Sequence, residues 1–202
     1  MRTNISSKGL AIIIGIVGIT SFLVFFIFWT PDVSVLATPM PIESVPDSIV
    51  AEQPRAGLPI RLKIPTIHVD AAIDSLGLTP EGLMDVPKGP GTTGWYELGP
   101  RPGEAGSAVI DGHFSWKNNL PAVFDNLSEL QKGDKIFVED DAGASIVFVV
   151  RDIQRYDPEA DASEVFFSTD GKPHLNLITC GGAWNKKSKS FSQRLVVFAD
   201  KE

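Results

Sequence analysis

Short apolar-alternating runs, separated by glycine- and proline-rich turns, are the feature that most limits what this chain can fold into. After residue 58, such runs cover residues 60–64, 67–73, 107–113, 135–139, 144–156, 173–180 and 194–199. Successive side chains of a strand point to opposite faces, so this alternation indicates strands with one buried face. Turns rich in glycine and proline, such as 89–91 and 99–103, break the runs. Apart from a helical rhythm over 120–130, the pattern predicts an all-β barrel or sandwich.

The N-terminal region carries a different signal. Residues 10–29 contain no charged side chain, and a run of this length is about what a helix needs to cross a bilayer. Arg2 and Lys8 precede the run and Asp32 is the first acidic residue after it, which predicts a cytoplasmic N-terminus and an exported remainder. A signal peptide cleaved after residues 35–37 is the alternative. Signal-peptide cores are shorter, usually about 7–15 residues, so we favour a retained signal-anchor.

These patterns predict four segments. Residues 1–9 form a cytoplasmic tail, 10–29 a transmembrane signal-anchor, 30–57 a linker with five prolines, and 58–202 the folded domain. The part after the anchor has 16 basic and 25 acidic residues, a net charge of −9. Such a surface argues against nucleic acid or anionic lipid as the main ligand.

Cys180 is the only cysteine of the chain, so it cannot form an intramolecular disulfide. It ends an alternating run that reads LNLITC and is followed by two glycines. Two interpretations remain open, a buried thiol that packs as a small hydrophobe and an exposed nucleophile. A nucleophilic cysteine needs a base or a positive charge nearby, because the thiolate is the reactive form.

Candidate partners for the thiol are few. His113 ends the run SAVIDGH beside a glycine, and Arg194 opens the last run after a stretch long enough for a return strand. His174 lies six residues before Cys180, roughly 20 Å along a strand, and His68 is most simply a polar strand residue. The acidic run 139–141 matches no calcium loop, and the sequence predicts no metal site and no cofactor.

The order His113, Cys180, Arg194, within the motifs DGH, LITCGG and QRLVVFA, resembles the sortases. These are membrane-anchored cysteine transpeptidases of bacterial, mostly Gram-positive, cell surfaces. The resemblance runs from about residue 58 to 199. It is closest to class F through GLMDVPKGPGTTGWYELGPRPGEAGSAVIDGH and PAVFDNLSELQKGD. It implies a closed eight-stranded β-barrel with short helices after an N-terminal transmembrane helix. It also implies a single-pass membrane protein whose catalytic domain is extracytoplasmic.

The resemblance also implies roles for three residues. Cys180 would attack the Thr–Gly bond of an LPxTG-type sorting signal and form a thioacyl enzyme. His113 would protonate the leaving amine and then deprotonate the incoming one. Arg194 would bind the substrate backbone and the oxyanion. The acyl group would pass to an amine of a cell-wall precursor or a pilin.

A substrate-binding set follows from the same resemblance. Thr179 would line the pocket, although simple packing is an alternative. Val165, Phe166 and Phe167, in the loop 157–172, would receive the leucine and proline of the signal, or else form a small core under that loop. Trp184 would flank the exit side.

Two alternatives to transpeptidation stay open. A cysteine peptidase would hydrolyse the same thioacyl intermediate, and a non-catalytic extracytoplasmic barrel would bury Cys180. The exact sorting motif and the amine acceptor do not follow from the sequence.

Overall fold

The computed structural model describes residues 56–202. The predicted tail and anchor, and all but the last two residues of the predicted linker, lie outside the described residues. Within 56–202, no helix combines the length and apolar composition needed to cross a membrane.

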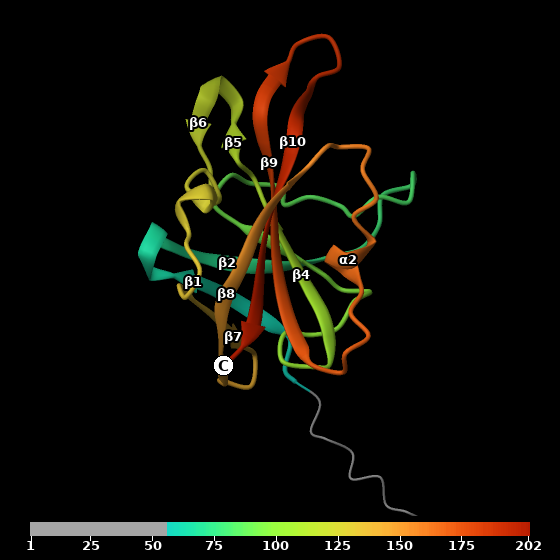
Figure 1. Ribbon diagram of the computed structural model, residues 1–202. Coiled ribbons are helices and arrows are strands. Elements are labelled where there is room, and N and C mark those ends of the chain that lie inside the picture. The colour runs from blue at the N-terminus through green and yellow to red at the C-terminus, as the bar shows by residue number, and fades with distance from the viewer. Residues whose placement is uncertain (1–55) are drawn as a thin grey trace, which may run out of the picture. The chain divides into compact units, whose positions relative to one another are not determined.

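The described region is built on a closed β-barrel, which confirms the fold predicted for it. Eight strands follow one another around the barrel in the order β1-β2-β3-β4-β9-β10-β8-β7, and β7 pairs with β1 (Figure 1). Their bounds are β1 (Pro59–Ile64), β2 (Val69–Leu76), β3 (Thr93–Tyr96), β4 (Gly106–Gly112), β7 (Lys135–Asp140), β8 (Ser145–Tyr156), β9 (Pro173–Asn185) and β10 (Ser190–Lys201). The remaining elements are short: η1 (Pro65–Ile67), β5 (Ser115–Trp116), η2 (Lys117–Asn119), β6 (Leu120–Pro121), η3 (Leu127–Glu129) and α2 (Ser163–Phe166).

Two pairings in this barrel are parallel, β2 with β3 and β4 with β9, and the others are antiparallel. A parallel pair cannot be joined by a tight hairpin, so a long connection joins β2 to β3. The connection 77–92 joins β2 to β3, and the connection 157–172, which carries α2, leads from β8 into β9. Both connections contribute residues to the pocket described below.

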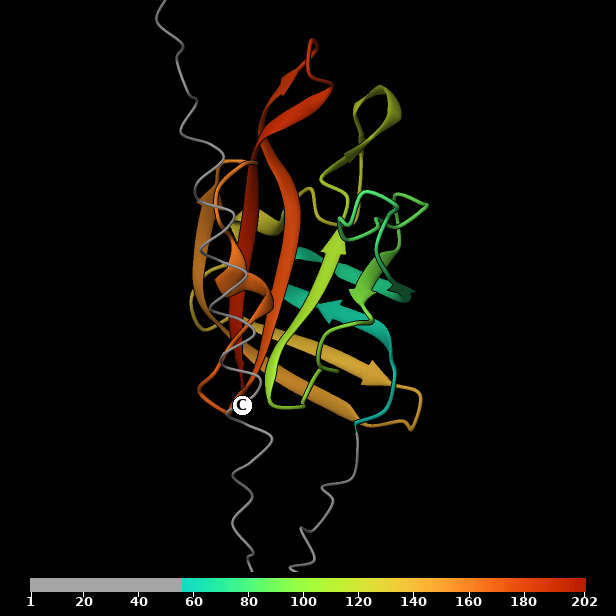
Figure 2. The ribbon, with the colours of Figure 1, turned by 90° about the vertical axis from the view of Figure 1, so that its right-hand side faces the viewer.

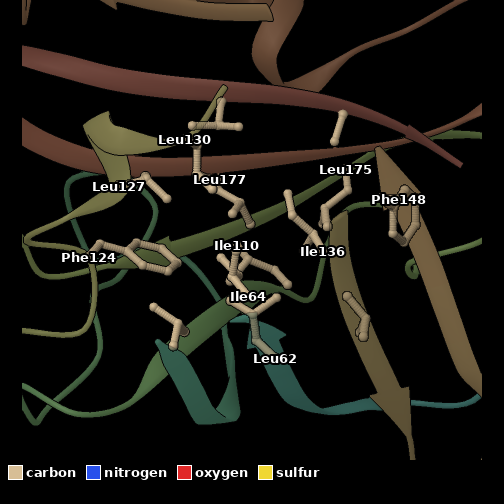
Figure 3. Packing of buried hydrophobic residues seen from close by; sticks show 14 of the residues in the cluster. Leu62, Ile64, Ile110, Phe124, Leu127, Leu130, Ile136, Phe148, Leu175 and Leu177 are labelled. Carbon is tan, nitrogen blue, oxygen red and sulfur yellow. The ribbon is translucent and has the colours of Figure 1, made fainter. Parts of the chain in front are cut away.

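The barrel interior holds the main hydrophobic core (Figure 3). Alternate residues of the strands point inward, as with Leu62 and Ile64 of β1 and Leu175 and Leu177 of β9, all fully buried. Each such side chain contributes about 1.5–3 kcal/mol through removal of apolar surface from water. A second, smaller cluster of Val165, Val196 and Phe198 lies between the sheet and α2.

Two hairpins project from the same end of the barrel in both views (Figures 1 and 2). One is the extension of β9 and β10, whose last pair is Asn185 with Ser190. The other is β5 with β6. The C-terminus lies at the opposite end.

The helix predicted over residues 120–130 is wrong. The structure has β6 at its start and a single 3-10 turn, η3, near its end. The apolar residues that gave the segment its helix-like spacing are buried in the core: Ala122, Phe124, Leu127 and Leu130. The backbone is not helical, because the Val123 N–H donates to the Pro90 carbonyl at 2.8 Å and the Phe124 N–H to the His113 carbonyl at 3.0 Å, and the bonds within the segment are isolated turns such as that from Leu127 to Phe124.

Three further differences from prediction concern the strands. The run 67–73 becomes a strand only from Val69, because His68 has a left-handed φ of 57° after η1. His68 is therefore a turn residue. β3, with buried Thr93 and Trp95, was not predicted because it lies between glycine-rich loops. The stretch 181–193, between the last two predicted runs, belongs mostly to the β9–β10 hairpin.

Candidate active site

Cys180 lies on β9 next to the last strand of the chain. The antiparallel register of β9 and β10 pairs Cys180 with Arg194. The thiol is partly exposed, in contrast to its neighbour Thr179, which is 1% exposed. The return strand predicted from the sequence spacing therefore places arginine directly beside the cysteine.

His113 follows β4 on the other side of β9. The parallel register of these strands pairs Asp111 with Ile178, and two residues further along both strands lie His113 and Cys180. The buried Thr179 hydroxyl donates to the Gly112 carbonyl at 2.7 Å and ties the strands together at this level. His113, Cys180 and Arg194 thus lie side by side on three adjacent strands, and we call them the cross-strand row.

The imidazole of His113 is held from two sides. Its Nε2 lies 2.7 Å from the Pro87 carbonyl oxygen, and its ring centroid lies 4.9 Å from that of Trp116. A carbonyl oxygen only accepts, so Nε2 carries a hydrogen in this contact. Nδ1 is then the nitrogen left to exchange a proton with a substrate.

Electrostatics keep the resting thiol of Cys180 mainly protonated. Burial raises its pKa above the ordinary value of 9.0, the positive charge of Arg194 lowers it, and the carboxyl of Asp111 raises it. Arg194 is the group that favours the reactive thiolate here. Its Nη1 also donates to the carbonyl of Gln193 at 3.2 Å, which leaves other guanidinium hydrogens for a ligand.

The cross-strand row opens into one pocket of ≈ 640 Å³. Ile178 and Val196 contribute apolar side chains from the sheet, next to Thr179. One wall comes from residues 83–86 of the β2–β3 connection, and the other from residues 156–166 at the end of β8 and in the connection to β9. The pocket is a cleft of the size that binds peptides or small ligands, with chemically active groups at one side.

The wall that carries α2 is fixed to the sheet by a buried polar contact. Asn176, 1% exposed, donates from Nδ2 to the Val165 carbonyl at 2.6 Å. Phe166 packs edge-on against Tyr96, with ring centroids 5.7 Å apart. Val165 is therefore held in the small core with Val196 and Phe198, and Phe166 packs against that core at the pocket.

A family model described as a sortase domain matches residues 62–202 of this chain. The chain belongs to the sortase family.

Among solved structures, this sortase is similar to sortase C-1 from Actinomyces oris, with 27% identity and a TM-score of 0.56 over 70% of this chain and 72% of that one. It is also similar to Pilus Island 1 sortase C2 of Group B Streptococcus, with 25% identity and a TM-score of 0.54 over 71% and 73% of the two chains. A lid mutant of sortase A from Corynebacterium diphtheriae, 24% identical with a TM-score of 0.56, supports the fold alone over 76% and 74%. Curated proteins gave no match. The assignment to class F stays a prediction.

Six of the eight predicted site residues of this sortase line the pocket: His113, Cys180, Arg194, Thr179, Val165 and Phe166. The other two lie outside its lining. Phe167 is 74% exposed, and Trp184, on the projecting hairpin, packs edge-on against Phe191 with ring centroids 5.0 Å apart. Their role in substrate binding stays a prediction.

The histidine of β9 lies away from the row, as predicted. His174 is buried and contacts two carboxylates, Asp200 at 2.7 Å and Asp170 at 3.0 Å. Among residues 56–202, no three His, Cys, Asp or Glu side chains are grouped so as to hold a metal ion.

Sequence reasoning missed one titratable group of this site. Asp111 lines the pocket, and burial raises its pKa to about 6, against the opposing effects of His113 and Arg194. Its position two residues before His113 was the available signal, because residues i and i+2 of a strand share a face.

Proposed function

We propose that this sortase is a cysteine transpeptidase that cleaves an LPxTG-type sorting signal between threonine and glycine. In this proposal it transfers the new acyl end to an amine of a cell-wall precursor or a pilin. The observation that carries the proposal is the cross-strand row, which puts a thiol between an imidazole and a guanidinium at the side of a peptide-sized pocket. Nucleophile, proton donor and oxyanion partner are the three roles that acyl transfer requires.

In the first half-reaction, the Cys180 thiol gives its proton to Nδ1 of His113, and the resulting thiolate adds to the threonine carbonyl carbon. The carbonyl electrons move onto oxygen, and the Arg194 guanidinium donates hydrogen bonds to that oxyanion. Collapse breaks the bond to glycine, and protonated His113 gives its Nδ1 proton to the leaving amine. The products are a thioester on Cys180 and a free glycine amine.

In the second half-reaction, an amine attacks the thioester carbonyl. Neutral His113 accepts the proton that the amine loses, and the thiolate of Cys180 leaves. Water follows the same path, so hydrolysis is the side reaction. The partly buried side chains of Phe166 and Ile178 are suited to the leucine and proline of the signal, and the buried Val165 and Val196 pack against them.

The proposal includes the setting of the enzyme. The uncharged run 10–29 would anchor the protein as a single-pass helix with its N-terminus in the cytoplasm. The catalytic domain would then act outside the membrane, where sorting-signal proteins and cell-wall amines meet.

Partial exposure of Cys180 favours catalysis over the non-catalytic alternative. A binding barrel with a structural thiol requires that thiol to be buried, whereas Cys180 is partly exposed and lines the pocket. Hydrolysis by a cysteine peptidase uses the same intermediate and is distinguished by its products.

A peptide assay tests the proposal. The domain 58–202 is incubated with a library of LPxTG-type peptides, with and without an added amine, and the products are analysed by mass spectrometry. We expect a thioacyl adduct on Cys180 and a peptide–amine product, both lost in Cys180→Ala. No adduct and no turnover with a reduced thiol would refute the enzyme assignment, and acid product alone in excess amine would indicate a peptidase.

A further inference from the structure

Asp111 lines the pocket beside the cross-strand row, toward the start of β4. On β4 it precedes His113 by two residues and is paired with Ile178 of β9 and Gly94 of β3. Two residues along a strand span about 7 Å, so the backbone of Asp111 lies about 7 Å from that of His113. It is half-buried, and it lines the pocket together with Cys180.

The surroundings of this carboxyl compensate its charge only in part. Its neighbours in the pocket include the apolar side chains of Ile178, Val165 and Val196. Burial is the largest influence on Asp111 and raises its pKa to about 6, although His113 and Arg194 act in the opposite direction. At neutral pH the group is mostly ionised, and a bound peptide would remove still more water from it. A partly buried carboxylate is stabilised by an added positive charge beside it, so an occupant with a positive charge is favoured.

Carboxylates also exceed permanent cations around the whole pocket. Asp85, Asp157 and Glu159 line it along with Asp111, and Arg194 is the guanidinium that faces them. Asp157 and Glu159 are exposed and screened by solvent, so each contributes little alone. Together they give the pocket the same sign of charge as Asp111, which steers a cationic peptide toward it.

We propose that Asp111 is a specificity-determining residue that makes this sortase prefer sorting signals with lysine or arginine at the variable position of the motif. The inference rests on the proposed function, because that function sets the position of the peptide. With the threonine carbonyl at Cys180, the variable residue lies between that thiol and the apolar surface that receives proline and leucine. Asp111 pairs with Ile178, at the edge of that surface nearest the row, so a long basic side chain of the variable residue can extend toward its carboxyl.

Matched peptides test the proposal. The kcat/KM of wild-type domain is measured on LPKTG, on the same peptide with acetylated lysine, on LPQTG and on LPETG. Acetylation keeps the length of the side chain and removes its charge. We expect LPKTG to exceed its acetylated form by about tenfold, mainly through KM, with LPETG the poorest, and we expect added salt to narrow the difference.

Two variants assign the preference to Asp111. In Asp111→Asn the lysine and acetyl-lysine peptides should differ by less than about twofold, whereas Asp111→Glu should keep the preference. Asp74→Asn removes the same charge from an exposed position on β2, outside the pocket lining, and should behave as wild type.

Equal turnover of charged and acetylated peptides by wild type would overturn this inference and leave the proposed function standing. An unchanged preference in a folded Asp111→Asn variant would overturn it too. If that variant does not fold, loss of the preference in Asp111→Ser would support the proposal, and its retention would refute it. No turnover of any peptide by wild type would refute the proposed function and this inference together.

Discussion

Replacement of Thr179 by valine isolates one hydrogen bond that holds the site together. Thr179 is 1% exposed, and its hydroxyl donates to the Gly112 carbonyl at 2.7 Å. That bond joins β9, which carries Cys180, to the end of β4, which carries His113. Valine has nearly the same shape, so the change removes the hydroxyl without opening a cavity.

The expected cost follows from what the substitution leaves behind. The Gly112 carbonyl loses a donor in a buried position, and an unpaired buried acceptor costs about 1–3 kcal/mol. In a domain of this size each kcal/mol lowers Tm by about 3 °C, so Tm should fall by roughly 3–10 °C. The value of kcat should fall by more than the loss of folded protein at 25 °C accounts for. The reason is that Gly112, the residue before His113, loses the hydrogen bond that fixes its position.

Thermal denaturation followed by circular dichroism gives Tm, and peptide turnover gives kcat. Thr179→Ser is the matched control: it keeps the donor and loses a methyl group, which costs about 1 kcal/mol. The rate of Cys180 alkylation should stay close to wild type in both variants. A valine variant that is inactive yet as stable as wild type would refute the reasoning, since the hydroxyl would then act on substrate.

Three further predictions concern other residues at or near the pocket. Asn176→Leu removes the donor to the Val165 carbonyl at 2.6 Å; it should destabilise the domain by about 1–2 kcal/mol and speed proteolysis within 157–172, and equal proteolysis rates would contradict it. Gly112→Ala puts a Cβ 2.5 Å from a ring carbon of the buried Phe124; we expect a loss of about 1–3 kcal/mol in urea unfolding and lower turnover, and unchanged values would refute the contact. The pKa of Asp111 is raised from 3.8 to about 6. The folded state therefore binds that proton more tightly, and this contribution, at most about 3 kcal/mol, is complete below pH 3.8 and lost as pH rises through 6. Asp111→Asn should flatten the stability curve between those pH values, and an unchanged curve would show that another group dominates.

Much of the site was predictable because it depends on strand neighbours. Arg194 follows Cys180 at a distance that suits a return strand, and the observed register pairs the two. The motif DGH placed His113 at a strand end, where β4 in fact stops one residue earlier. Family resemblance supplied the chemistry that these residues are expected to perform.

Other features depend on contacts that a local pattern does not record. The apolar spacing of 120–130 imitates a helix, yet Phe124 bonds through its backbone to His113, a residue brought close by the fold. Asp111 looked like an ordinary polar strand residue until two distant loops, at 83–86 and 156–166, enclosed it with the cysteine. Trp184 was expected to flank the exit side of the site, whereas it lies on the long β9–β10 hairpin, outside the pocket lining.

The parallel pairing of β4 with β9 has a consequence for how the enzyme is made. Ser107 of β4 pairs with His174 of β9, residues far apart in the sequence, with β7 and β8 between them. Loop closure over such a distance is entropically costly and tends to come late in folding. His113 and Cys180 meet only when this pair forms, so the nucleophile and its acid come together through this one long-range closure. During synthesis the nucleophile therefore stays without its acid until nearly the whole chain is available.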